Sequence, residues 1–175
     1  MGKTGGGLGW RYLFAGPSQS YIWGESGYAI HPEWELPVIR TGKDALRTHT
    51  EGEGHTVAFQ DVAVQPDTRY VASVWVRASD FKPGEGFGAR PGDSAGLLIQ
   101  ELDGQGGLIA THPKVAVTKP CDYTRLQDAF RTTKRTATVR FLLDTTLACR
   151  YDQGHVTYDD CALAAEPTRQ PDGRE

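Results

Sequence analysis

The chain of 175 residues contains no asparagine, and its single methionine is the first residue. The loss of thermolabile side chains fits a heat-adapted source, and it fits a GC-rich genome equally well. Basic residues are not in excess, because 19 Lys and Arg stand against 22 Asp and Glu, for a net charge of −3. This balance argues against a nucleic-acid-binding protein. No apolar run approaches the length of a membrane span, so we expect neither nucleic acid nor a membrane as a partner.

The first residues lack the apolar centre of a signal peptide. We interpret residues 1–9 as a flexible leader, residues 10–165 as one domain, and residues 166–175 as a linker-like tail. A chain of this size buries a single sizeable core. An intracellular protein is one interpretation. We favour a module cut from a larger secreted protein, extracellular or at the cell surface, with its export signal left on the parent chain.

Cysteine is scarce, and the three residues Cys121, Cys149 and Cys161 show no Cys-x-x-Cys spacing. A zinc site is therefore not expected. A disulfide between two of them and three buried thiols are both open. The five histidines are dispersed, and the Gly-x-Ser-x-Gly and His-Glu-x-x-His motifs are absent. The sequence thus offers no catalytic motif, and we expect the protein not to be an enzyme.

What the chain has in abundance is the period-two alternation of strands. The predicted strands are residues 42–50, 57–64, 69–77, 95–102, 108–117, 123–132, 136–143 and 155–163. Short turns rich in glycine, proline and aspartate separate them, and Gln65-Pro66-Asp67-Thr68 predicts a hairpin between residues 57–64 and 69–77. The regular spacing predicts an all-β fold, a jelly-roll β-sandwich of two antiparallel sheets.

Four short motifs follow one another over residues 36–165. They are Gly42-Lys43 with Leu46, the stretch Val64 to Arg77, the turn Asp103-Gly104, and the closing strand Tyr158 to Leu163. In this order they resemble the carbohydrate-binding modules of families four, nine, sixteen and twenty-two, β-sandwiches of the galactose-binding jelly-roll type. Two features depart from the family pattern: the usual opening motif "N-gsFE" is absent, and Cys161 stands where valine is usual.

The resemblance implies a non-catalytic carbohydrate-binding module whose partners are a polysaccharide or oligosaccharide and an appended glycan-degrading enzyme. Such a module raises the effective concentration of the enzyme at its substrate. Two other functions stay open. One is a jelly-roll domain that packs against a neighbour and has no sugar affinity. The other is a small glycan hydrolase or lyase, which needs titratable groups with perturbed environments in a cleft.

A sugar ring presents apolar C–H patches to aromatic rings and hydroxyl groups to polar side chains. Alternation along residues 69–77 places Tyr70, Ala72, Val74 and Val76 in the core. It places Trp75 and Arg77 together on the other face, which we predict to be the concave binding face. The alternative for Trp75 is plain core filling.

Further candidates for the sugar site come from other segments. Trp23 and Trp34 are candidates to line one edge of the cleft, or else to pack as a lid over one end of the sandwich. Gln100 and Glu101 alternate, so one of them must face the cleft or solvent. Arg140 shares a strand face with Asp144, and both are candidate hydroxyl partners.

The resemblance also implies a structural calcium ion at one end of the sandwich. Calcium takes six to eight hard oxygen ligands. The candidate ligands are Asp159 or Asp160 of the closing motif and the backbone of Lys43, with assistance from Asp44. The alternative is that the two closing aspartates accept hydrogen bonds from neighbouring loops.

Overall fold

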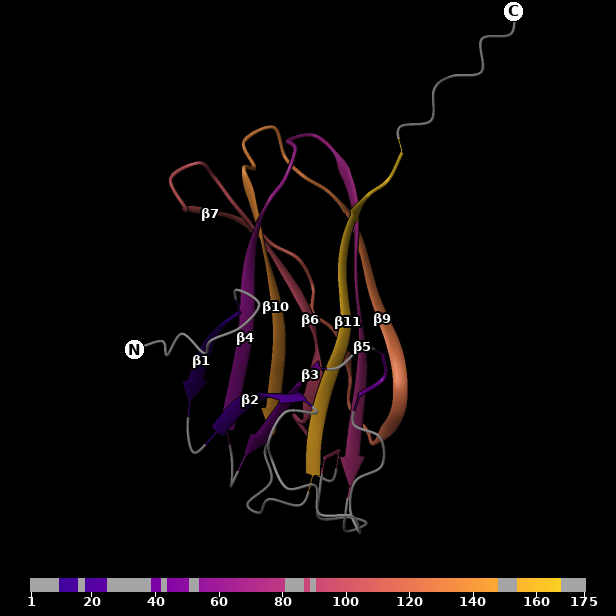
Figure 1. Ribbon diagram of the computed structural model, residues 1–175. Helices are drawn as coiled ribbons and strands as arrows, with labels where there is room; N and C mark the ends of the chain where they lie inside the picture. Colours follow the sequence, from indigo (N-terminus) through magenta and orange to yellow (C-terminus); the bar gives the residue numbers. More distant parts are fainter. Residues whose placement is uncertain are drawn as a thin grey trace, which may run out of the picture.

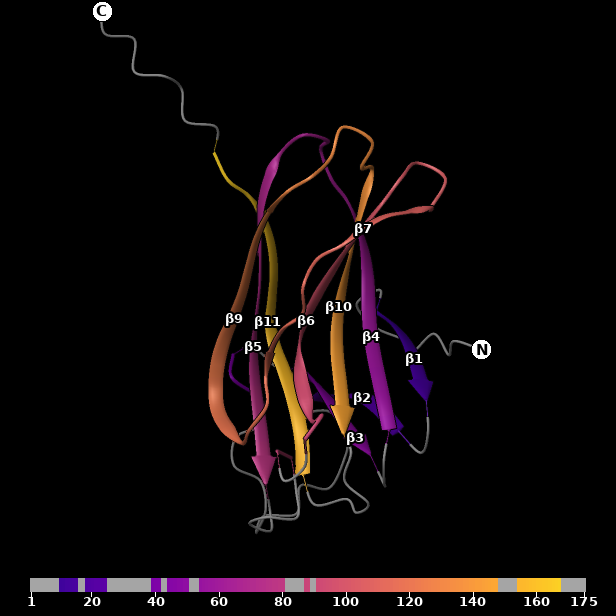
Figure 2. The ribbon, with the colours of Figure 1, turned by 180° about the vertical axis from the view of Figure 1, so that it is seen from behind.

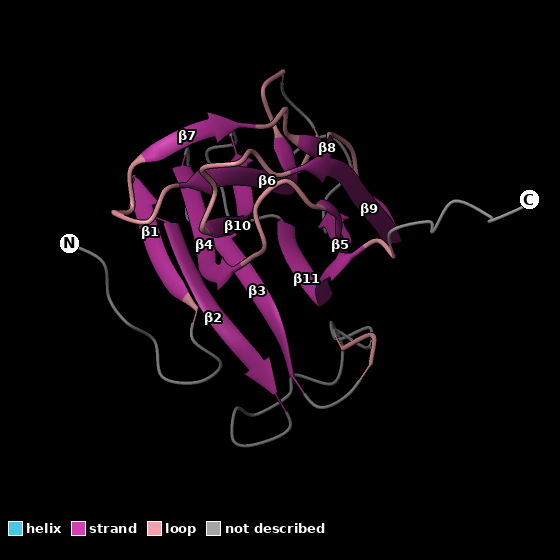
Figure 3. Cartoon of the chain, turned by 90° about the horizontal axis from the view of Figure 1, so that it is seen from above, coloured by secondary structure: helices cyan, strands magenta, loops and turns pink. Residues whose placement is uncertain are grey.

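The computed structural model describes residues 10–15, 18–24, 39–41, 44–50, 54–80, 87–88, 91–147 and 154–167. Within these ranges the chain forms eleven strands and no helix, arranged as two antiparallel sheets that face each other (Figure 1). The view from above shows the two layers (Figure 3). The prediction of an all-β sandwich is therefore confirmed. Nowhere in the described ranges does a helix of membrane-spanning length and hydrophobicity occur.

Sheet A has the strand order β1-β4-β10-β6-β7, and β8 also pairs with β6 (Figure 2). Its members are β1 (Arg11–Ala15), β4 (Gly54–Ala63), β10 (Thr138–Leu147), β6 (Ser94–Leu102), β7 (Leu108–Thr111) and β8 (Val115–Val117). Sheet B has the order β2-β3-β11-β5-β9. Its members are β2 (Ser18–Gly24), β3 (Asp44–Thr50), β11 (Gly154–Ala165), β5 (Arg69–Asp80) and β9 (Cys121–Arg131).

The predicted hairpin across residues 65–68 is wrong. Strand β4 pairs with β1 and β10 in sheet A, whereas β5 pairs with β11 and β9 in sheet B, so the turn carries the chain from one sheet to the other. Several hydrogen bonds hold this crossing. Among them, the backbone N–H of Gln65 donates to the Tyr70 hydroxyl at 2.9 Å, and the N–H of Thr68 donates to the Thr132 hydroxyl at 2.9 Å. The residues of the turn predict that the chain reverses direction here, but they do not indicate to which sheet each flanking strand belongs.

Two other differences concern strand bounds. The predicted strand over residues 108–117 is divided into β7 and β8, because His112, Pro113 and Lys114 interrupt it. Proline lacks the N–H that a continuous ladder needs. The aromatic front of the chain, which carried no strand prediction, contributes β1 and β2.

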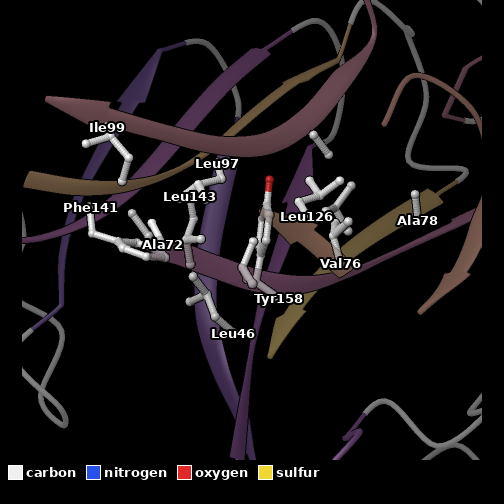
Figure 4. Packing of buried hydrophobic residues seen from close by; sticks show 14 of the residues in the cluster. Leu46, Ala72, Val76, Ala78, Leu97, Ile99, Leu126, Phe141, Leu143 and Tyr158 are labelled. Atoms are coloured by element: carbon white, nitrogen blue, oxygen red, sulfur yellow. The ribbon is translucent and has the colours of Figure 1, made fainter. Parts of the chain in front are cut away.

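The main core lies between the sheets, where the inward positions of facing strands interdigitate. The residues assigned to the core of β5 are buried, with Ala72, Val74 and Val76 fully so. Tyr158 of β11 lies among Leu143 and Leu126 (Figure 4), and its hydroxyl lies 2.8 Å from that of Thr145 in sheet A. Burial raises the pKa of Tyr158 far above its usual value, so this phenol joins the two sheets as a neutral group.

Neither interpretation of the cysteines matches the described residues in full. Cys121 is half-buried, Cys161 is exposed, and both are free thiols. Cys149 lies outside the described residues. A disulfide that joins Cys121 to Cys161 is thus excluded, and so is a set of three buried thiols.

Candidate functional site

The side of sheet A that faces away from sheet B, here called the outer face of sheet A, carries an ordered set of polar side chains. Arg140 on β10 is the register partner of Asp61 on β4 and of Gln100 on β6. Register partners point to the same side of a sheet. The alternation that sends Val139 and Phe141 into the core therefore sends these three side chains outward, in one row across three strands.

An apolar row runs beside this polar row. Phe59 of β4 pairs with Leu142 of β10, which pairs with Leu98 of β6. Together with Val57 they form a small cluster separate from the main core. Phe59, Leu142 and Val57 are buried although they face away from sheet B. Something on this face must therefore cover them.

Two arginines form part of that cover. The guanidinium carbon of Arg11 lies 4.5 Å from the centre of the Phe59 ring, and that of Arg140 lies 4.7 Å from it. Both positions are within the range of cation–π attraction. Asp61 holds the arginines there, because it accepts from Nε and Nη2 of Arg140 at 2.7 and 3.0 Å and also from Arg11.

The protonation state of Asp61 follows from these contacts. The hydrogen bond from Arg140 holds the pKa of the Asp61 carboxyl below its usual value, with a smaller contribution from Arg11 and despite partial burial. Asp61 is thus ionised at neutral pH. A bidentate pair of this kind fixes the plane of the guanidinium group as well as its position.

A second polar cluster lies on the far side of the apolar row. Asp144 lies four residues beyond Arg140 along β10, which is about 13 Å at the rise of a strand. One of its oxygens lies 2.8 Å from Nε2 of His55, and the other accepts from Nζ of Lys114. Lys114 also donates to the Ser94 hydroxyl at 2.8 Å. The prediction that Arg140 and Asp144 share a face is confirmed.

The outer face of sheet A therefore alternates polar, apolar and polar rows across neighbouring strands. The polar rows offer N–H donors and an amide, and the apolar row between them is capped by flat guanidinium groups. Such a surface suits a ligand that has hydroxyl or carboxylate groups along its edges and C–H groups on its faces.

The residues Trp75 and Arg77 lie elsewhere. Their neighbours Val74 and Val76 point into the core, so both side chains lie on the outer face of sheet B, on the opposite side of the molecule from Arg140 and Gln100. Trp75 is half-buried rather than core filling, and the guanidinium group of Arg40 lies 3.7 Å from its ring centre. The structure does not bring Trp75 and Arg77 together with Gln100 and Arg140.

Glu101 is placed in the interior, not on a ligand-binding surface. It is only 2% exposed, and its carboxylate lies 2.9 Å from Nε2 of His112 and accepts from the backbone N–H of Thr133 at 2.9 Å and from the Thr136 hydroxyl. Burial raises the pKa of Glu101, but these hydrogen bonds outweigh it and the pKa lies below the usual value. Glu101 thus ties β6 to the connection between β9 and β10, and of the two alternating candidates only Gln100 faces outward.

The two closing aspartates occupy a bulge in β11, where Asp160 has a positive φ of 47°. Asp159 accepts from the backbone N–H groups of Arg40 at 2.7 Å and Thr41 at 3.3 Å, and from that of Asp160 at 2.7 Å. Asp160 accepts from the Arg40 guanidinium and the Thr41 hydroxyl. All four carboxylate oxygens therefore already have protein donors.

This arrangement does not fit a calcium site built on the two carboxylates, because their oxygens and their negative charge are satisfied by the segment at Arg40. It fits the hydrogen-bonding alternative. Within the described part of the chain no group of three or more His, Cys, Asp or Glu is placed to hold a metal ion. Lys43 and the side chain of Asp44 lie outside the described residues, so the predicted ligand set is tested only at its two closing aspartates.

Two of the predicted aromatic residues also remain untested. Trp34 and the side chain of Trp23 lie outside the described residues. The residues that sequence reasoning missed are Arg11, His55, Asp61 and Lys114. For Asp61 a signal was present, since the alternation of residues 57–61 puts it on the same face as Phe59. Arg11 and Lys114 lie in or beside short strands whose sheet neighbours the sequence does not reveal.

Comparisons with known proteins agree on the fold. No protein-family model matches the chain, and no curated protein matches its sequence. Among solved structures, the enzymatically active domain of tailspike protein 4 from bacteriophage CBA120 matches with a TM-score of 0.59 and 10% identity, over 90% of this chain and 19% of that one. A family 16 carbohydrate-binding module matches with a TM-score of 0.51 and 21% identity, over 76% of this chain and 89% of that one.

A third similar structure is a Stig cyclase, Fisc from Fischerella sp. TAU, with a TM-score of 0.53 and 19% identity over 92% of this chain and 86% of that one. At such identities the likeness shows the fold alone. The chain has the jelly-roll β-sandwich fold of carbohydrate-binding modules, as the four sequence motifs predicted. The tailspike match also shows that this fold occurs as a small part of a longer chain.

Proposed function

We propose that this chain is a non-catalytic carbohydrate-binding module and that the outer face of sheet A is its binding surface. The observation that carries the proposal is the apolar row of Phe59, Leu142 and Leu98 between two rows of polar side chains. Arg140 and Gln100 lie in one of these rows, and Lys114 in the other. The likeness of the fold to carbohydrate-binding modules supports this assignment.

Binding on this face differs from the mode that the sequence suggested. The described side chains offer no bare aromatic platform, because the Phe59 ring lies beneath two guanidinium groups. The polar rows therefore supply most of the contacts, and the arginine planes take the place of exposed rings. As a module of a larger secreted protein, the chain would hold an appended enzyme close to its polysaccharide.

The test is affinity electrophoresis through gels that contain soluble polysaccharides, with two variants. Gln100→Ala removes a polar group from the outer face of sheet A, and Trp75→Ala removes the aromatic residue from the opposite sheet. We expect one glycan class to retard the wild type, Gln100→Ala to reduce the retardation, and Trp75→Ala to leave it unchanged. The reverse pattern would place the site on sheet B, and no retardation by any glycan would favour a packing domain.

The likeness to a cyclase over most of both chains is an observation that favours an enzymatic function. The hydrolase or lyase alternative is checked by incubating the protein with the polysaccharide that retards it in the gel. A hydrolase would produce new reducing ends, and a lyase would produce new unsaturated sugars. Binding without product is the result expected of a non-catalytic module. Turnover would overturn this part of the proposal.

A further inference from the structure

We infer that the outer face of sheet A selects acidic polysaccharides, with the carboxylate of a uronic acid bound by Arg11 and Arg140. This inference rests on the proposed function, and it names the ligand class for the same site. Arg77, the other arginine among the candidates for the sugar site, lies on the opposite sheet. The partner of Arg140 is Arg11, because both contact Asp61 and the Phe59 ring.

The charges on this face are layered by depth. In the first cluster the side chains of Arg11 and Arg140 are 45% and 30% exposed, and that of Asp61 is 25% exposed. In the second cluster Lys114 is 23% exposed and Asp144 only 11%. In each cluster the cation reaches further into solvent than the carboxylate that holds it. An approaching ligand thus meets positive charge first.

The count of charges points the same way. Three permanent cations, Arg11, Arg140 and Lys114, stand against two carboxylates on the described part of this face. His55 adds a further positive charge when it is protonated. The whole chain carries a net charge of −3, so it has no general attraction for polyanions. Any preference for an acidic glycan must therefore come from this local arrangement.

The remaining hydrogen-bonding capacity consists largely of donors. Both oxygens of Asp61 are in use, whereas Nη1 of Arg140 and both Nε and Nη1 of Arg11 have no hydrogen-bond partner among the described residues. Guanidinium groups bind carboxylates strongly and with defined geometry. Because Asp61 and Phe59 already orient both groups, little side-chain freedom is lost when a ligand binds.

The test is calorimetric titration of the full chain with polygalacturonate, alginate and hyaluronate, and with neutral xylan and mannan. Methyl-esterified galacturonan is the matched ligand control, because it has the same backbone without the charge. We expect binding to at least one uronate polymer, loss of that binding on esterification, and weakening of at least tenfold in Arg11→Gln and in Arg140→Gln. Arg11→Gln leaves the Arg140–Asp61 pair intact, so it tests the site without breaking that contact.

Arg125→Gln is the matched protein control. It removes one exposed positive charge from β9, on the opposite sheet. Equal weakening in this variant would show attraction by overall charge and would overturn the inference. Binding to neutral glycans alone would overturn it as well, while the carbohydrate-binding function would stand. Binding to no glycan of either kind would overturn both.

Discussion

At the scale of single residues, the buried carboxylates of Glu101 and Asp159 have structural roles. The sequence had made them candidates for binding a sugar and a calcium ion. Glu101 is held by three donors inside the sandwich, and Asp159 by backbone N–H groups at the bulge of β11. A buried acceptor whose partners are all protein groups contributes to stability, and its removal leaves those donors unpaired. Substitution at each position therefore tests its structural role.

The first substitution is Glu101→Gln, whose effect depends on pH. Because the pKa of Glu101 is lowered in the folded chain, its charged form stabilises the fold above the unfolded value of about 4.5. This stabilisation is lost as the pH falls through the lower folded pKa. We expect the variant to be less stable than the wild type at pH 7, by about 1.5–3 kcal/mol. Thermal unfolding from pH 7 to pH 3 measures the difference, which should shrink at the acidic end. A difference that stays constant over this range would contradict the role given to the charge.

The second substitution concerns Asp159 and calcium. Asp159→Ala leaves the backbone N–H groups of Arg40, Thr41 and Asp160 without their acceptor, and we expect a loss of about 2–3 kcal/mol in the free energy of unfolding. Because the carboxylates already pair with Arg40, adding calcium to the wild type should leave its Tm unchanged. Denaturant and thermal melts, with calcium and with a chelator, check both statements. A Tm that rises with calcium in the wild type but not in Asp159→Ala would contradict the second statement and support a calcium site at this corner.

At the scale of elements, the close approach of β8 to β6 gives the sharpest prediction. A Cβ atom on Gly96 would lie 2.7 Å from the Cα of Ala116 and in contact with the carbonyl oxygen of Val115. Gly96→Ala must therefore push β8 away from β6, at a cost of about 1–3 kcal/mol. Gly104→Ala is the control, since a Cβ atom added there would have no other atom within 4 Å. Equal denaturation midpoints for the two variants would mean that β8 does not pack here.

The elements also show what local sequence signals can and cannot provide. Alternation located most of the strands, and it assigned the core side of β5 correctly from Tyr70 to Val76. The same signal could not say that β4 and β5 belong to different sheets, because strand pairing depends on partners far away in the chain. Residues 138–147, for example, pair with 54–63. The turn at Pro66 fits either topology.

The candidate site shows the same limit. The prediction that Arg140 and Asp144 share a face was correct, because alternation settles the face of a single strand. For Gln100 and Glu101 alternation left open which of the two faces outward, and the structure shows that it is Gln100. Trp75 was grouped with them on chemistry alone, and it lies on the other sheet. Arg11 joins the site only through the pairing of β1 with β4, in which it lies opposite Phe59, far away in the sequence. No local pattern contains that information.

At the scale of the whole molecule, the two outer faces of the sandwich differ in kind. The outer face of sheet A carries exposed cations above recessed carboxylates. On the outer face of sheet B, Arg40 covers Trp75 and also pairs with Asp160, so its charge is used within the protein. Exposed arginines also lie on sheet B, at Arg69, Arg125 and Arg131. Sheet A is distinguished by two arginines that share one carboxylate and one aromatic ring, and we therefore expect the binding face there.

The most direct test is to follow the backbone amide chemical shifts of labelled protein during a titration. The ligand added is an oligosaccharide of the glycan class that retards the protein in gels. We expect the largest changes at outward positions of β4, β10 and β6, including Asp61, Arg140 and Gln100, and small changes at Trp75 and Arg77. Changes concentrated on β5 and β9 would contradict the assignment of the site to sheet A.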